Sequence, residues 1–151
     1  MRYFEDFSAG TVRTAPGTYP VTEDEIVEVG TRWDPQPFHT DAEAARDSIF
    51  GGLVASSVHL FAIAVWLGST YEDKVDAVTA LGFKELQWHA PARAGDRLRL
   101  RSTTLSTRVS RSRPDCGIVE SRSQIINQDD ELVFSYQGAA LIRRRPADTS
   151  S

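Results

Sequence analysis

The sequence is poor in cysteine and in long apolar runs, and each shortage excludes a class of protein. Its single cysteine, Cys116, excludes an intrachain disulfide, a CxxC redox pair and a cysteine-rich zinc site. The longest apolar run, LFAIAVWLG, is too short to cross a membrane. The first ten residues, MRYFEDFSAG, lack the apolar segment of a signal peptide. We therefore expect a soluble, cytoplasmic protein.

Excess charge of one sign is also missing. The net charge of −4 gives no reason to expect a surface for nucleic acid or an anionic membrane. With 151 residues, 40% of them hydrophobic and 25% charged, the chain has the size and composition of one globular domain. We expect that domain to occupy residues 1–151, with a polar, flexible tail over about 144–151.

The first half of the chain carries signals for short helices. In TEDEIVEVGTRW, Thr22 is a suitable N-cap and Glu25 stands three residues later, as in a capping box. Two prolines then stop this helix, because proline disfavours helical backbone at the residue before it. A second short helix is predicted over TDAEAARDSIF, capped by Thr40 or Asp41.

The segment LVASSVHLFAIAVWLGSTY is apolar on nearly every side, which predicts a central, buried helix. Period-two alternation then follows in four segments, which predicts strands over residues 80–91, 96–110, 117–128 and 131–145. One very apolar helix needs a sheet to cover it. We therefore predict an α+β fold in which a curved antiparallel sheet wraps around the helix.

The stretch DPQPFHTD holds a carboxylate and an imidazole five positions apart, at Asp34 and His39. The two side chains are either an ordinary polar turn before a helix or an acid–base pair. Histidine exchanges protons near neutral pH, and a nearby carboxylate can tune it. The prolines also restrict the loop, so little entropy is lost when the pair is held for catalysis.

The second candidate element is FGGLVASSVHL, where small residues precede the apolar helix. They either break and cap the chain there or leave the first helical N–H groups open to a ligand. Unpaired amides at a helix start favour negative charge. Together with an acid–base pair, they would suit proton transfer next to a carbonyl that becomes an enolate.

The segments RWDPQPFHTDAEAARDSIFGGLVASSVHL and WHAPARAGDRLRL resemble the MaoC-like dehydratase family, of the (R)-specific enoyl-CoA hydratase type. The resemblance covers about residues 3–143. It implies a hotdog fold, with Asp34 and His39 as the catalytic pair and the Ser57 backbone N–H in the oxyanion hole. Two departures from the family pattern stand out: Gln36 replaces asparagine, and Ser56–Ser57 replaces His-Gly.

The resemblance further implies interconversion of a trans-2-enoyl thioester and a 3-hydroxyacyl thioester. Gln36, Gly52 and Ser56 are expected to contact this substrate. Coenzyme A or acyl carrier protein would enter only as part of the substrate, and neither a separate cofactor nor a metal is expected. A homodimer is the default assembly, and higher homo-oligomers remain open. The alternatives are a hotdog acyl-CoA thioesterase, a non-catalytic acyl-thioester-binding protein, and a chain that needs a different partner subunit.

The other aromatic and histidine side chains receive structural interpretations. His59 lies inside the apolar helix and is predicted to be a packed core histidine. His89, at a strand end, is expected either to have a structural role or to line the channel that would hold the thioester substrate. The three tryptophans are expected in the core or at a dimer contact: Trp33, Trp66 and Trp88.

Overall fold

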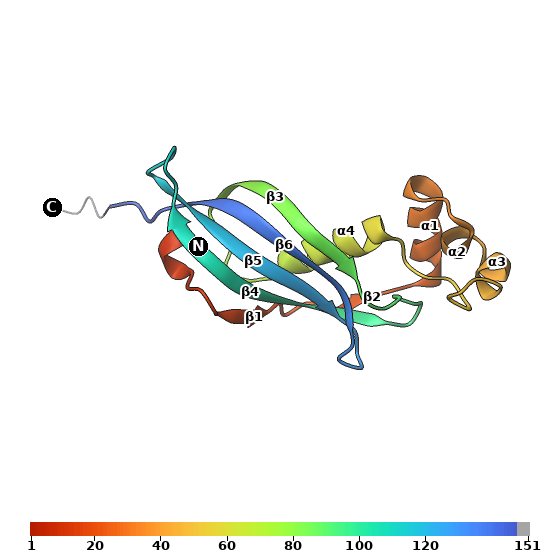
Figure 1. The fold of residues 1–151 in the computed structure, drawn as a ribbon. Helices are drawn as coiled ribbons and strands as arrows, with labels where there is room; N and C mark the ends of the chain where they lie inside the picture. Colours follow the sequence, from red (N-terminus) through yellow and green to blue (C-terminus); the bar gives the residue numbers. More distant parts are fainter. Residues whose placement is uncertain (148–151) are drawn as a thin grey trace.

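A computed structural model describes residues 1–147, which form one antiparallel sheet and a set of short helices (Figure 1). The helices are the 3₁₀ turn η1 (Phe4–Asp6), α1 (Glu23–Trp33), α2 (Pro37–Thr40), α3 (Ala42–Arg46) and α4 (Ser57–Gly68). The strands are β1 (Val12–Thr14), β2 (Tyr19–Pro20), β3 (Ala77–Trp88), β4 (Arg97–Val109), β5 (Cys116–Ile126) and β6 (Leu132–Arg143). This arrangement confirms the predicted α+β class.

The four long strands correspond to the four segments with period-two alternation. The sheet order is β1-β4-β5-β6-β3, with β2 paired to β4. The turn between β5 and β6 uses Asp130 in the left-handed region (φ 58°), and Asn127 Oδ1 accepts hydrogen bonds from the N–H groups of Asp129 and Glu131. Strands β1 and β2 were not predicted, because two or three residues are too few to show a period.

Both predicted short helices form, with two local differences. Thr22 Oγ1 accepts from the Glu25 N–H at 3.2 Å, as an N-cap should. The Glu25 carboxylate, however, binds other side chains instead of completing the capping box. The segment expected to be a stiff loop contains the helical turn α2, with Pro37 at its first position. Proline suits that position because the first helical N–H has no intrahelical acceptor.

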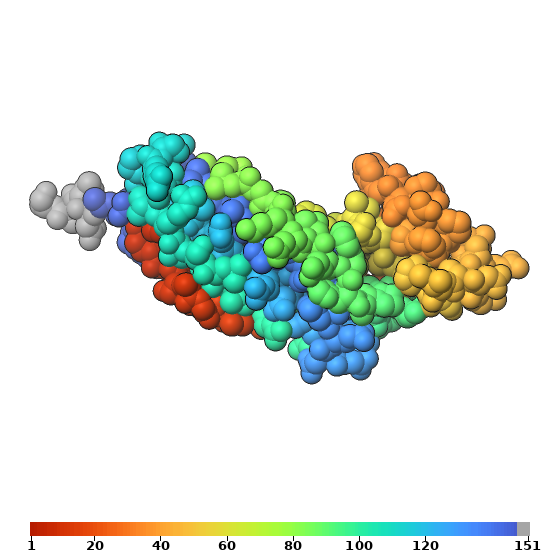
Figure 2. Space-filling model, viewed as in Figure 1, coloured from red at the N-terminus to blue at the C-terminus, as the bar shows by residue number. Residues whose placement is uncertain are grey.

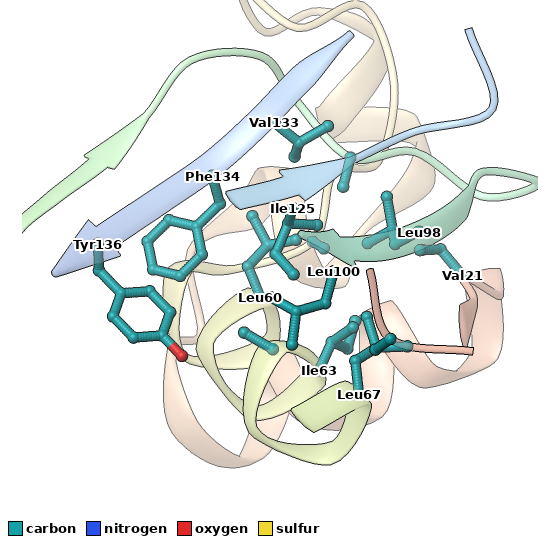
Figure 3. Close-up of a cluster of buried hydrophobic side chains, with 14 of the residues drawn as sticks. Val21, Leu60, Ile63, Leu67, Leu98, Leu100, Ile125, Val133, Phe134 and Tyr136 are labelled. Carbon is teal, nitrogen blue, oxygen red and sulfur yellow. The ribbon is translucent and has the colours of Figure 1, made fainter. Parts of the chain in front are cut away.

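The core lies where one face of α4 meets the concave side of the sheet (Figure 3). Leu60, Ile63 and Leu67 are at most 2% exposed. The expectation that α4 is buried all round was wrong, because Val58, Val65 and Trp66 on its other face are about half exposed. A single sheet can cover only one side of a helix.

Strand β3 lies at an end of the sheet and pairs only with β6 among the described residues. All its residues are exposed. Large apolar side chains lie along it: Val78, Leu81, Phe83, Leu86 and Trp88. Figure 2 shows this strand, in green, on the surface of the molecule. Trp33, Trp66 and Trp88 are all exposed in the single chain, so none of them is a core residue here.

The expected tail begins at the end of β6. Arg144 Nε lies 3.1 Å from Glu5 Oε1, and Arg145 Nη2 lies 2.6 Å from Asp6 Oδ1, so the first tail residues contact η1. The rest of the predicted tail, residues 148–151, lies outside the described residues. Over residues 1–147, no helix is both long and apolar enough to span a bilayer.

Candidate active site

The structure brings Asp34 and His39 together at the end of α1. Asp34 is the C-cap of α1, and its N–H donates to the carbonyl of Gly30 at 2.9 Å. The Gln36 N–H then donates to the Asp34 carbonyl, and the His39 N–H to the Gln36 carbonyl. These bonds fold the chain back, so that His39 Nε2 lies 3.4 Å from Asp34 Oδ2.

The tautomer of His39 follows from its second ring nitrogen. Nδ1 lies 2.6 Å from the carbonyl oxygen of Val54. A carbonyl can only accept, so Nδ1 must carry a hydrogen, and in the neutral ring Nε2 is left with the lone pair. The side chain is almost fully buried, with 6% of the residue exposed. His39 is therefore oriented as a base that acts through Nε2, on the side of Asp34.

Val54 is held by its own backbone bonds. Its N–H donates to the Phe38 carbonyl at 3.1 Å, and the N–H of Ala55 donates to the carbonyl of Ala92 at 2.9 Å. Ala92 belongs to the segment APARAGDRL, whose turn places Gly95 at φ 93° and lets Asp96 Oδ2 accept from the Arg93 N–H. The second sequence motif thus supports the segment that orients His39.

Ser57 is the first residue of α4, so its N–H has no intrahelical acceptor. It lines the same pocket as Asp34 and His39. No positive φ occurs at this position, since only Glu85 and Asp130 have one among the described non-glycine residues. Serine is therefore unstrained where the family pattern has glycine, and the start of α4 presents an amide to the pocket.

This pocket has a volume of about 320 Å³. Its remaining walls are mainly apolar and include Phe38, Leu60 and Trp88. His89 also lines it, with Nε2 2.8 Å from Ser135 Oγ, which agrees with the channel-lining interpretation. An imidazole, a carboxylate and the amide at a helix start thus line one apolar pocket. Such a combination can transfer a proton at the carbon next to a carbonyl and stabilise the negative charge that forms on the carbonyl oxygen.

The three residues predicted to bind substrate do not line the pocket. Ser56 is fully buried, and its Oγ accepts from the His59 N–H as the N-cap of α4. Gln36 is the N-cap residue of α2 and has no side-chain capping bond. Gly52 lies in the loop, where an added Cβ would be 3.5 Å from Arg93 Nη1. Of the three, only the Ser56 side chain has a capping role among the described residues.

A larger cavity, of about 410 Å³, lies at the other end of α4, beyond Gly68. Its rim carries Arg2, Arg13 and Lys74, and Asp73 pairs with both arginines. It contains none of the predicted site residues. Since it also has no acid–base pair on its walls, we place the candidate active site in the smaller pocket. Over residues 1–147, no three His, Cys, Asp or Glu side chains are grouped as metal ligands.

His59 is buried, as predicted, but it is not simply packed among apolar groups. Its Nε2 lies 2.6 Å from Glu25 Oε1, and its Nδ1 has no hydrogen-bond partner among the described residues. Sequence reasoning missed this pairing, because residues 25 and 59 are far apart in the chain. It also missed the role of Val54, whose carbonyl oxygen is a backbone atom and leaves no signature in residue type.

Comparison with known proteins places these observations in a family. The model of the MaoC like domain matches residues 6–124. The mesaconyl-CoA hydratase of Haloarcula hispanica is 32% identical over 125 residues, which are 80% of this chain and 34% of the hydratase. The chain thus spans about a third of that relative's length.

The solved structures agree on the fold. A MaoC-like dehydratase from Rhodospirillum rubrum is 36% identical and has a TM-score of 0.90, covering 97% of this chain and 99% of its own. A Mycobacterium tuberculosis protein with a double hotdog fold is 19% identical and has a TM-score of 0.79, covering 99% of this chain and 46% of its own. The predicted hotdog fold is confirmed.

Proposed function

The chain belongs to the MaoC-like dehydratase family, and on that premise we propose that it is a hydratase that interconverts a trans-2-enoyl thioester and a 3-hydroxyacyl thioester. The observation that carries the proposal is the pair of His39 Nε2 and Asp34 Oδ2, 3.4 Å apart in the pocket where α4 begins. Coenzyme A or acyl carrier protein would be part of the substrate, and the reaction needs no separate cofactor.

In the hydration direction, His39 Nε2 removes a proton from a water molecule, and the oxygen of that water attacks the β-carbon of the enoyl group. The electron pair of the double bond moves toward the thioester carbonyl and forms an enolate. The proton held by His39 passes to Asp34, which delivers it to the α-carbon. The pair ends as it began, and the net change is the addition of one water.

The distance of 3.4 Å between His39 Nε2 and Asp34 Oδ2 suits this order of proton transfers. It is longer than a normal hydrogen bond, so neither group is saturated by the other. The Val54 carbonyl keeps the hydrogen of neutral His39 on Nδ1 and hence the lone pair on Nε2. In the same pocket, the Ser57 N–H and the positive end of α4 would stabilise the negative oxygen of the enolate.

The deciding assay follows the loss of enoyl absorbance when the purified protein is incubated with crotonyl-CoA and with longer or branched enoyl-CoA substrates. Release of free thiol is measured in parallel. Hydration without thiol release supports the proposal. Thiol release instead would identify a thioesterase, and tight binding with no turnover would identify an acyl-thioester-binding protein.

Substitutions at Ser57 test the role of its backbone amide. Ser57→Gly should keep hydratase activity and accept a wider range of acyl groups, because it removes only bulk beside the thioester. Ser57→Val should raise KM or abolish binding. Loss of a true oxyanion donor costs about 3 kcal/mol, or roughly 10²-fold in kcat, and neither change removes the amide hydrogen. A loss of that size in Ser57→Ala at unchanged KM would show that the hydroxyl is the catalytic group.

The exposed apolar surface of β3 and α4 supports a homodimer. Within residues 1–147, strand β3 is paired on one side only, and an unpaired edge of this kind can recruit another strand. Val65 and Trp66 of α4 are also about half exposed, and such apolar surface is often buried by a partner.

We expect a dimer at micromolar concentration in analytical ultracentrifugation. Leu81→Lys and Phe83→Lys should shift the protein toward monomer, whereas a fully active wild-type monomer would contradict this assembly.

A further inference from the structure

Three buried or half-buried side chains outside the pocket form a hydrogen-bonded cluster. Glu25 Oε1 accepts from the Tyr19 hydroxyl at 2.6 Å and from His59 Nε2 at 2.6 Å. The three residues come from β2, α1 and α4, respectively. The Tyr19 ring also packs edge-on against Trp66 of α4, with ring centroids 5.2 Å apart. The cluster therefore joins three elements at one point.

Burial and the hydrogen bonds of the cluster shift the pKa values of Glu25 and Tyr19. Burial would raise the pKa of Glu25, but the hydrogen bonds from Tyr19 and His59 outweigh burial, and the pKa lies below its ordinary value. Burial, followed by the hydrogen bond to Glu25, raises the pKa of Tyr19 to about 12. At neutral pH, Glu25 is thus an anion that accepts from a neutral phenol and from the Nε2–H of His59.

Packing alone does not explain a histidine at position 59. The residue is 2% exposed, and its Nδ1 is left without a hydrogen-bond partner in the part of the chain that the structure describes. Buried polar atoms without partners are rare because they lose their hydration without compensation. A leucine would fill the position without that loss. The bond from Nε2 to Glu25 is the contact for which histidine is needed.

The location of this bond connects it to the active site. His59 lies two residues after Ser57, in the first turn of α4, and Glu25 lies in the first turn of α1. The other end of α1 carries Asp34 and packs through Gly30 against His39. Among the hydrogen bonds of residues 1–147, the His59–Glu25 bond is the one that joins α1 to α4. Helix α1 thus connects the start of α4, at one end, to the Asp34–His39 pair, at its other end.

We infer that Tyr19, Glu25 and His59 are positioning residues: they hold α1 against α4 so that Asp34 and His39 stay at a fixed place relative to the Ser57 amide. This inference rests on the proposed hydratase function. None of the three lines the pocket, so they act through the elements that they join and not on the substrate. A small shift of catalytic groups lowers the rate strongly while leaving substrate binding nearly intact.

The test compares His59→Leu with His59→Gln. Leucine removes the bond to Glu25 and also the unpartnered nitrogen, so the melting temperature should be unchanged or higher. We expect kcat to fall by about 10- to 100-fold with little change in KM. Glutamine can still donate to Glu25 and should recover most of kcat. Glu28→Gln, which changes an exposed carboxylate of α1 that forms no hydrogen bond with Tyr19, Glu25 or His59, is the matched control and should leave kcat close to that of wild type.

Wild-type kcat in His59→Leu would overturn the inference while leaving the proposed function intact. A wild-type protein that does not hydrate any enoyl thioester would overturn the proposed function instead. In that case, the imidazole resonances of His39 in NMR spectra of the free protein give the answer. They should move in His59→Leu and return toward their wild-type positions in His59→Gln, and unchanged resonances in His59→Leu would overturn the inference.

Discussion

Asp34→Asn and His39→Ala should each lower kcat for enoyl-thioester hydration by about 10²- to 10⁴-fold, the usual contribution of a positioned acid or base. The proposed reaction passes one proton from His39 to Asp34, so loss of either residue interrupts the same path. Circular dichroism should show that both variants stay folded. Asp34 is partly exposed, so Asp34→Asn should change the melting temperature little. His39→Ala should lower the melting temperature, because it leaves a cavity and takes the hydrogen bond away from the Val54 carbonyl. Steady-state kinetics with crotonyl-CoA measures the loss.

The double variant sharpens this test. Residues that act as a unit lose activity in a non-additive way, so Asp34→Asn with His39→Ala should be little worse than the more damaging single change. Asp47→Asn removes an exposed carboxylate at the nearby end of α3 and should keep wild-type kcat. If the two single losses multiply in the double variant, the side chains work independently and the shared proton path is wrong.

Gly30→Ala should lower kcat by about 10²-fold through contact with His39. A Cβ at position 30 would lie 2.7 Å from the backbone oxygen of His39 and 2.8 Å from its Cβ. Both distances are too short, and a backbone oxygen cannot move aside without moving its residue. His39 would therefore shift relative to Asp34, and a displacement of about 1 Å is enough for a loss of this size. Kinetics and circular dichroism on the same preparation separate this effect from unfolding.

Gly68→Ala provides the matched control. The residue is also a helical glycine, but a Cβ there would lie 3.8 Å from Leu100 Cδ2, an ordinary contact. Alanine favours helix by up to about 1 kcal/mol over glycine, so this variant should be as stable as wild type or more so, with full activity. Full activity in Gly30→Ala would mean that the close approach of α1 to His39 does not set the geometry of the pair.

Local pattern in the sequence was enough to predict the class of fold. Period-two alternation predicted the long strands because successive side chains of a strand point to opposite faces of the sheet, and in β4 this places Leu98 and Leu100 in the core. The N-cap at Thr22 and the end of α1 before the prolines are likewise decided within a few residues. The Asp34–His39 pair could also be proposed as a candidate site from the sequence, since both residues belong to one short segment.

Residue type could not reveal the contacts between distant segments. The Val54 carbonyl that sets the tautomer of His39 and the bond from His59 to Glu25 join segments 15 and 34 positions apart. Likewise, α4 looked buried on all sides because composition records apolar residues but not how many sheets are available to cover them. The sequence by itself was enough to name the candidate catalytic residues, since that choice depends on functional groups. Only the tertiary structure decided their orientation and support, because these depend on where the folded backbone places its carbonyls, its helix ends and its uncovered faces.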